Sequence, residues 1–267
     1  MSIDSGYRYE YIVYEKQEQE QEQVATITFN RPESWNALNT ALLNELRTAL
    51  EDAEADADIR VLVITGAGEK AFSTGADIGE ISDKIKRPEE ARELVRSVQS
   101  ILTLIERMQK PVIAKINGFC LGCGLELALA CDLRITSDNS IFGLPEVNLA
   151  LIPGGGGTQR LPRLIGKTKA MEMLMTGEQI DAAEALRWKL VNKAVPVDEL
   201  DRTVTGLIKK LLAQSPVTLG ILKNAVNRGI EMDLKHALQY EAECFEAALK
   251  TKDAQERVRA FLDKKKS

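Results

Sequence analysis

Residues 110–135, KPVIAKINGFCLGCGLELALACDLRI, contain the pattern that decides the fold. Pro111 ends a preceding helical segment, and Val112–Ile116 is a short apolar run typical of a strand buried on both faces. A helix is expected to begin near Cys123, and the chain is expected to return as a strand at 133–136. This order of strand, helix and strand indicates an α/β core with crossover connections.

The same alternation continues over the first part of the chain. Further strands are expected at the β-rich runs 9–14, 24–30 and 61–65. The polar tract EKQEQEQEQ at 15–23 cannot bury apolar surface, so we expect it to be the solvated connection of a hairpin. Asn39 is expected to cap a helix with regularly spaced leucines, and Pro88 is expected to open a second long helix.

From about residue 158 onward the strand signal fades. Helices are expected at 158–165, 168–175, 181–189, 198–213, 217–229, 234–249 and 253–264, with one short strand near 191–195. We therefore predict an α/β core at 1–200 and a helical region at 201–267 that caps the core or makes subunit contacts.

Length and charge narrow the classes of protein. The 267 residues fit one large domain, and 44% hydrophobic residues support a substantial core. The net charge of −5 argues against a nucleic-acid partner, which favours a basic surface. No apolar run reaches the roughly 18 residues of a membrane span, and the opening MSIDSGYRYEY shows no signal or transit pattern. A cytoplasmic location is therefore expected.

Two glutamates stand in apolar surroundings. Glu126 lies among leucines in GCGLELALACD (122–132), and Glu146 follows a proline in FGLPEVNLALIP (142–153). Carboxylates are rarely buried unless they are paired, and burial raises their pKa toward the range that is useful for proton transfer. The two acids are therefore the first candidates for catalysis.

Two glycine-containing turns offer backbone hydrogen-bond donors. The turn at 118–124 leads into a helix and directs the N–H of Cys123 toward a cleft, where a helix N-terminus favours negative charge. Gly75 allows a sharp bend in the segment 71–78. Two such donors from two loops would form an oxyanion hole, and Glu126 would share the helix of one of them.

Three other motifs favour plain structural roles. Cys120 and Cys123 form a CxxC, but too few further ligands remain for a structural zinc site, so we expect no metal. The glycine run 154–157 lacks the Lys-Ser/Thr of a P-loop and is expected to let a helix approach the strands closely. His236 is the only histidine and lies in a predicted helix, which disfavours a Ser-His-Asp triad.

In combination, four stretches resemble the crotonase (enoyl-CoA hydratase/isomerase) family. They are NRPESWNALN (30–39), VLVITGAGEKAFSTGADI (61–78), the opening stretch 110–135 and FGLPEVNLALIPGGGGTQRLPRLIG (142–166). The resemblance implies a crotonase-like spiral of ββα turns with a helical C-terminal region. It also implies assembly into homotrimers or into homohexamers that are dimers of trimers.

The resemblance implies an enoyl-CoA hydratase, in fatty-acid or related acyl-CoA degradation. Ala76 and Cys123 occupy the positions whose N–H groups hold the thioester oxygen, although many relatives carry glycine at the second position. The thiol is therefore expected to point away from the acyl pocket or to narrow it. Glu126 is expected to orient and deprotonate the water, and Glu146 to supply the proton to C2. No metal or redox cofactor is implied, because coenzyme A arrives as part of the substrate.

Further substrate-binding positions follow from the resemblance. They are Ser34, Trp35, Asp77, Ile78, Gly79, Phe261 and Lys264, together with Ala76 and Cys123. For Trp35 a place in the apolar core is the alternative, and Asp77 is expected to brace the oxyanion loop or cap the next helix. Gly79 stands where many relatives carry a basic residue. Phe261 and Lys264 would reach the nucleotide, sometimes across a subunit boundary; the alternative is that they belong to a frayed basic tail. The floor of the acyl pocket is expected from 79–100 and the C-terminal helices.

Three alternatives stay open. A Δ3,Δ2-enoyl-CoA isomerase or another acyl-CoA enzyme of the same superfamily would keep the oxyanion hole but alter the use of the acids. A non-catalytic RNA-binding relative is the third, since the helix at 84–110 carries several basic residues. These are Lys84, Lys86, Arg87, Arg92, Arg96, Arg107 and Lys110. Acidic residues interrupt them, so a solvated helix face is the favoured interpretation.

Overall fold

The computed structural model describes residues 9–19, 22–84 and 87–264. Lys86, residues 1–8 of the opening segment and residues 265–267 of the basic tail lie outside these ranges. The strands are β1 (Ile12–Gln19), β2 (Glu22–Phe29), β3 (Ile59–Gly66), β4 (Ala71–Ser73), β5 (Val112–Ile116), β6 (Phe119–Leu121), β7 (Leu133–Ser137), β8 (Ile141–Gly143), β9 (Ile180–Asp181) and β10 (Lys193–Val195). The α-helices are α1 (Thr40–Ala55), α2 (Ile78–Lys84), α3 (Pro88–Arg107), α4 (Cys123–Ala130), α5 (Gly157–Ile165), α6 (Lys167–Thr176), α7 (Ala182–Arg187), α8 (Leu200–Leu212), α9 (Pro216–Gly229), α10 (Leu234–Leu249) and α11 (Lys252–Lys264). The short 3-10 helices are η1 (Pro32–Ser34), η2 (Pro145–Leu149) and η3 (Val197–Glu199).

The strands form two sheets that the chain visits in turn. One sheet has the order β1-β2-β3-β5-β7-β10, and only β1 and β2 pair antiparallel in it. The other has the order β4-β6-β8-β9, with β8 and β9 antiparallel. Each turn places one strand in the first sheet and the next in the second, as in β3–β4 and β5–β6, before a helix returns. The expected α/β spiral of ββα turns is confirmed.

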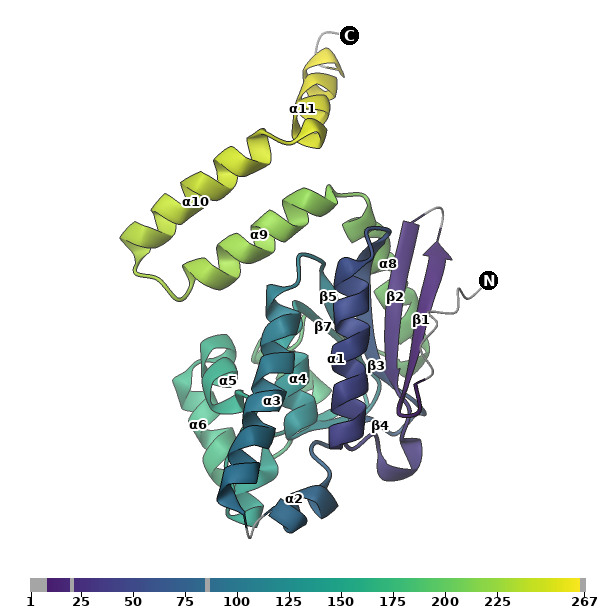
Figure 1. Cartoon of the computed structure of the whole chain (residues 1–267), viewed down its shortest axis with the longest axis vertical. Helices are drawn as coiled ribbons and strands as arrows, with labels where there is room; N and C mark the ends of the chain where they lie inside the picture. Colours follow the sequence, from purple (N-terminus) through teal and green to yellow (C-terminus); the bar gives the residue numbers. More distant parts are fainter. Residues whose placement is uncertain (1–8, 20–21, 85–86, 265–267) are drawn as a thin grey trace.

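The central strands of the larger sheet are covered by helices on both faces (Figure 1). Leu62 and Ile64 of β3 belong to the core that includes α1 and α3, whereas Val61 and Val63 belong to a second cluster with α8. Successive side chains of a strand point to opposite faces, so a continuous apolar run suits such a strand. The helix α8 therefore covers the sheet face opposite to α1 and α3.

Local signals for the long helices are confirmed. The Asn39 side chain accepts a hydrogen bond of 2.8 Å from the Leu42 N–H at the start of α1. Pro88 is the first residue of α3, where its missing N–H costs nothing. The helices expected beyond residue 200 are present as α8 to α11.

The predicted hairpin connection at 15–23 is wrong in extent. The antiparallel ladder of β1 and β2 continues through this tract to the pair Gln19 and Glu22. Ladder hydrogen bonds join main-chain groups, so a polar sequence does not prevent them. The first strand also begins at Ile12 and not at residue 9. The strands of the smaller sheet were not predicted, because two or three residues carry too little periodicity.

The last two helices extend away from the rest of the chain (Figure 1). α10 packs against α9, and α11 lies at the end of the molecule opposite to α2. Several apolar side chains of α9 to α11 are exposed: Leu222, Val226, Leu234, Leu238, Phe245, Leu249 and Val258. In the described part of the chain, no helix combines the length and apolar character needed to cross a membrane.

Candidate active site

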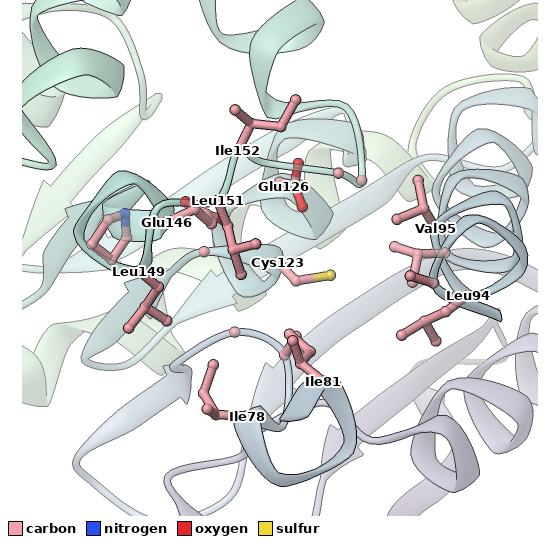
Figure 2. A pocket seen from close by; sticks show the side chains of 18 of the residues that line it. Ile78, Ile81, Leu94, Val95, Cys123, Glu126, Glu146, Leu149, Leu151 and Ile152 are labelled. Atoms are coloured by element: carbon pink, nitrogen blue, oxygen red, sulfur yellow. The ribbon is translucent and has the colours of Figure 1, made fainter. Parts of the chain in front are cut away.

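A cavity of about 510 Å³ opens between α2, α3, η2 and the turn before α4. Its walls are largely apolar and include Ile78, Ile81, Ala91, Leu94, Val95, Val98, Leu149, Leu151 and Ile152. Glu126 and Glu146 are the charged side chains in this lining, and Figure 2 shows both beside Cys123. An apolar cavity with a few convergent polar groups is the usual form of a small-molecule site.

Glu126 lies in the first turn of α4 and is only 2% exposed. Its Oε1 accepts a hydrogen bond of 2.7 Å from the Gly157 N–H. Burial raises the pKa of this carboxyl, while N–H groups of the loop 155–157 and the charge of Arg160 act in the opposite direction. The chain therefore holds a buried acid against backbone donors.

The glycine run 154–157 contacts this acid directly. A Cβ atom at Gly155 would lie 2.6 Å from Glu126 Oε2, and one at Gly157 would lie 3.1 Å from Oε1. Glycine is therefore needed so that the loop can fold around the carboxylate. The sequence predicts only that the run lets a helix approach the strands closely. Its position relative to Glu126 depends on tertiary structure, and the sequence carries no signal for it.

Glu146 lies in η2, directly after Pro145. Burial raises its pKa to about 7; its own backbone N–H opposes that shift, and the charge of Glu126 adds to it. Its Oε2 atom is buried and has no hydrogen-bond partner among the described residues. An unpartnered buried carboxyl oxygen facing a cavity is available to a substrate atom or a water molecule.

Two turns bring free backbone donors to the edge of this cavity. Leu38 pairs with the segment around Ala76 through Gly75 O and the Asp77 N–H, so the Ala76 N–H has no backbone partner in the described chain. Cys123 is the first residue of α4, where an N–H has no intrahelical acceptor.

The two turns touch each other at their glycines. Gly75 has a φ of +103°, and a Cβ atom there would lie 3.2 Å from the Cys123 nitrogen. Gly122, with a φ of +51°, lies against the Gly75 Cα and against the Glu146 carboxyl. The structure therefore places the N–H groups of Ala76 and Cys123 on adjacent backbone segments beside both acids.

The thiol of Cys123 points into the cavity (Figure 2). Its side chain is 8% exposed, and burial raises its pKa well above the ordinary value, with the charges of Glu126 and Glu146 acting in the same direction. A neutral thiol is a small wall group and a poor nucleophile. Of the two expected orientations, the structure shows the one that narrows the pocket. Cys120 is buried separately in the core.

The residues that follow Ala76 divide between cavity and scaffold. Ile78 lines the cavity. Asp77 accepts a hydrogen bond of 3.0 Å from Arg31 and another of 3.0 Å from the Gly79 N–H. Asp77 therefore braces the loop before α2, and Gly79 lies outside the cavity lining.

The other predicted substrate residues lie outside this cavity. Ser34 and Trp35 belong to η1 and its end, and Trp35 is 42% exposed and stacks on Phe119 with 5.3 Å between ring centroids. The alternative that Trp35 is a core residue is wrong. Phe261 and Lys264 lie in α11, at the far end of the chain from α2 (Figure 1). Within one described chain these two residues are not brought to the acids.

The acyl-pocket prediction holds in part. Ile81, Ala91, Leu94, Val95 and Val98 come from the expected segment 79–100. The C-terminal helices contribute no lining residue within the described chain, so this half of the prediction is wrong for a single chain. The loop from Leu149 to Ile152 takes their place and was not predicted. The apolar residues of this loop were the only feature of the sequence that could have indicated its place in the cavity wall.

Comparison with known families adds an independent observation. Residues 19–267 match the family model described as enoyl-CoA hydratase/isomerase. The chain is 41% identical to the short-chain-enoyl-CoA hydratase of Clostridium acetobutylicum, with coverage of 96% of this chain and 95% of that protein. It is 42% identical to the crotonyl-CoA hydratase of Syntrophomonas wolfei, with coverage of 97% of both.

Solved structures agree with these similarities. The enoyl-CoA hydratase of Bacillus anthracis is 40% identical, and its crystal structure superposes with a TM-score of 0.89 over 96% of this chain and 97% of that one. The enoyl-CoA hydratase of Mycobacterium smegmatis gives a TM-score of 0.90 at 30% identity, with coverage of 96% and 97%.

Proposed function

The chain belongs to the enoyl-CoA hydratase/isomerase family, and from this premise we propose that its cavity adds water reversibly to a trans-2-enoyl-CoA thioester. The product is a 3-hydroxyacyl-CoA, and the enzyme is a hydro-lyase. The observation that carries this proposal is that the buried carboxyl group of Glu126 and the partly buried one of Glu146 face one apolar cavity, beside the backbone N–H groups of Ala76 and Cys123.

The backbone donors would act on the thioester carbonyl. The N–H groups of Ala76 and Cys123 would polarise this oxygen, which makes C3 electrophilic and stabilises the enolate-like charge after attack. Each preorganised donor of this kind contributes about 3 kcal/mol. The apolar walls exclude water other than the reacting molecule and strengthen both hydrogen bonds.

The acids would move one proton each. Glu126, as a carboxylate, takes a proton from the water molecule while the oxygen of that water bonds to C3. Glu146, as carboxylic acid, gives its proton to C2 on the same face, which completes a syn addition. The pair therefore begins and ends with one proton, and dehydration uses the same two groups in reversed roles.

The groups that line the cavity favour short acyl chains. The Cys123 thiol stands in the wall where many relatives carry glycine, and α3 closes the side formed by Leu94 and Val95. The similar proteins from Clostridium and Syntrophomonas are named for short-chain and crotonyl substrates. We assign the enzyme to the degradation of fatty acids or related acyl-CoA compounds.

Coenzyme A would enter only as part of the substrate, with no metal or redox cofactor. Ser34 and Trp35 lie in the loop joined to the Ala76 turn, since Trp35 O accepts hydrogen bonds from Thr74. This contact supports a role for that loop along the pantetheine. The four cysteines are all free thiols, which suits the reducing cytoplasm. Activity that survives dialysis against a chelator would support the absence of a metal.

A homotrimer or a dimer of trimers accounts for the exposed C-terminal helices. Apolar side chains such as Leu238 and Phe245 are 55% and 65% exposed on α10, and a second copy of this chain would cover them. The same assembly would bring Phe261 and Lys264 of one subunit toward the nucleotide of another. Light scattering should give the mass of three or six chains, whereas a monomer would refute this assembly.

The enzymatic proposal is tested with crotonyl-CoA. We expect the 2-enoyl thioester absorbance to disappear with the wild-type enzyme but not with Glu126→Gln or Glu146→Gln, provided that both variants fold. Product analysis should find 3-hydroxybutyryl-CoA; isomerised enoyl-CoA alone would identify an isomerase. No turnover of short, long or cyclic enoyl thioesters, together with salt-sensitive RNA binding, would refute the hydratase.

A further inference from the structure

Behind the acid Glu126, the structure contains an ion pair that joins three segments. Arg160 of α5 forms two hydrogen bonds with the Glu106 carboxylate of α3, from Nε to Oε1 at 2.7 Å and from Nη2 to Oε2 at 2.9 Å. The side chains are 17% and 34% exposed, respectively. A two-point arginine–carboxylate pair fixes the plane of the guanidinium as well as its position.

The third hydrogen bond of this guanidinium reaches the loop that holds Glu126. Arg160 Nη1 donates to Gly155 O at 2.8 Å. The backbone N–H of Arg160 also donates to Gly156 O at 2.8 Å. Gly156 has a φ of +118°, and a Cβ atom there would lie 2.2 Å from Arg160 Nη1. The guanidinium is therefore packed against the outer side of the loop.

The inner side of the same loop contacts the acid. Gly157 N donates to Glu126 Oε1 at 2.7 Å, and Gly155 lies against Oε2. The loop therefore lies directly between the Arg160 guanidinium on one side and the Glu126 carboxyl on the other. Any shift of the Arg160 guanidinium would move the donor that orients Glu126.

We propose that Arg160, held by Glu106, is a positioning residue for hydration: it clamps the loop 155–157 so that the Glu126 carboxyl keeps its orientation. This inference rests on the proposed hydratase activity. Arg160 does not line the catalytic cavity, so its action passes through the loop and through its charge.

The charged and titratable groups near Glu126 allow the two effects to be separated. They are Glu146 of η2, the Cys123 thiol of α4, Arg160 of α5 and, behind it, Glu106 of α3. Arg160 favours the carboxylate, whereas Glu106 partly cancels the charge of Arg160. Removing the cation and removing its anionic partner should therefore shift the Glu126 titration in opposite directions.

The experiment compares wild-type enzyme with Arg160→Gln, Arg160→Lys and Glu106→Gln, using the pH dependence of kcat and KM for crotonyl-CoA. For Arg160→Gln we expect kcat to fall about tenfold to a hundredfold, as for a small misplacement of a catalytic group, with KM little changed. The low-pH fall of kcat, called here the acid limb, should move to higher pH. The reason is that Glu126 takes up a proton more easily once the positive charge of Arg160 is gone. Glu106→Gln should move this limb to lower pH, and Arg160→Lys should keep the wild-type limb with an intermediate kcat.

Arg163→Gln is the matched control. It lies on the same helix and pairs with Glu231 at 2.9 Å, but it is half exposed and does not touch the loop. It should keep the wild-type kcat and acid limb. Circular dichroism and the oligomeric mass of each variant show that it is folded.

A folded Arg160→Gln enzyme with wild-type kcat, or with lower kcat but an unmoved acid limb, overturns the proposal. Should this variant not fold, an unmoved limb in Glu106→Gln overturns it equally. A carboxyl carbon NMR titration, assigned with Glu126→Gln, measures the same shifts without turnover. An inactive wild-type enzyme would therefore refute the hydratase function, while the titration would still decide the role of Arg160.

Discussion

Raising the pH through about 7 should lower hydratase activity, because Glu146 has to carry the proton that it gives to C2. Burial in the apolar cavity, together with the charge of Glu126, raises its pKa to about 7. A group with this pKa is about nine tenths protonated at pH 6 and about one tenth at pH 8, so kcat/KM should fall about tenfold over this interval. At low pH a second limb should appear, where Glu126 takes up a proton and no longer accepts one from water.

The assay is the initial rate of absorbance loss with crotonyl-CoA well below KM, measured from pH 5 to 9 in buffers of constant ionic strength. kcat/KM reports the ionisations of the free enzyme and not those of its complex with substrate. Hydration takes up no net proton, so dehydration of 3-hydroxybutyryl-CoA must give the same profile and serves as an internal control. Hydration and dehydration both require the form of the enzyme in which Glu126 and Glu146 together carry one proton.

Glu146→Gln completes the test. Removing a general acid lowers the rate by about 10²–10⁴-fold, and any residual activity should lack the limb near pH 7. A wild-type profile that is flat between pH 6 and 8 would refute the assigned protonation state. A limb near pH 7 that persists in the Glu146→Gln enzyme would refute its assignment to Glu146.

Three further substitutions test other parts of the structure. Gly155→Ala places a Cβ atom 2.6 Å from Glu126 Oε2, so kcat should fall about a hundredfold while the melting temperature changes little, and normal kcat would contradict the tight loop. Cys123→Gly keeps the backbone donor and removes the thiol from the cavity wall. The kcat/KM for crotonyl-CoA should stay within about tenfold of the wild-type value. The ratio of hexenoyl-CoA turnover to crotonyl-CoA turnover should rise if the thiol limits chain length. Phe72→Ala removes a fully buried ring that packs edge-on against Phe29 at 5.5 Å, and denaturant unfolding should show a loss of about 3–5 kcal/mol, whereas a loss below about 1 kcal/mol would contradict that packing.

The elements that could be predicted are those with strong local signals. Asn39 and Pro88 mark the starts of α1 and α3 through hydrogen bonding and backbone geometry that involve only neighbouring residues. The short strands of the smaller sheet carry no such signal. β4 and β6 exist because each pairs with a strand that lies far away in sequence, and such pairing cannot be read from three residues.

The polar tract at 15–23 shows the opposite error. Its composition predicted a connection, but main-chain pairing between β1 and β2 continues into it. Local composition indicates where apolar surface is lacking, and it does not determine where a ladder ends.

For the site, the sequence alone determined which groups can do chemistry: two acids in apolar surroundings, Glu126 and Glu146, and glycine turns that can free backbone donors. Tertiary structure decided which of them meet. It placed Gly75 against Cys123, wrapped the loop 155–157 around Glu126 and set Arg160 behind that loop. The physical reason is that the pKa of an acid depends on burial and on the distances to other charges and donors, and folding alone sets these.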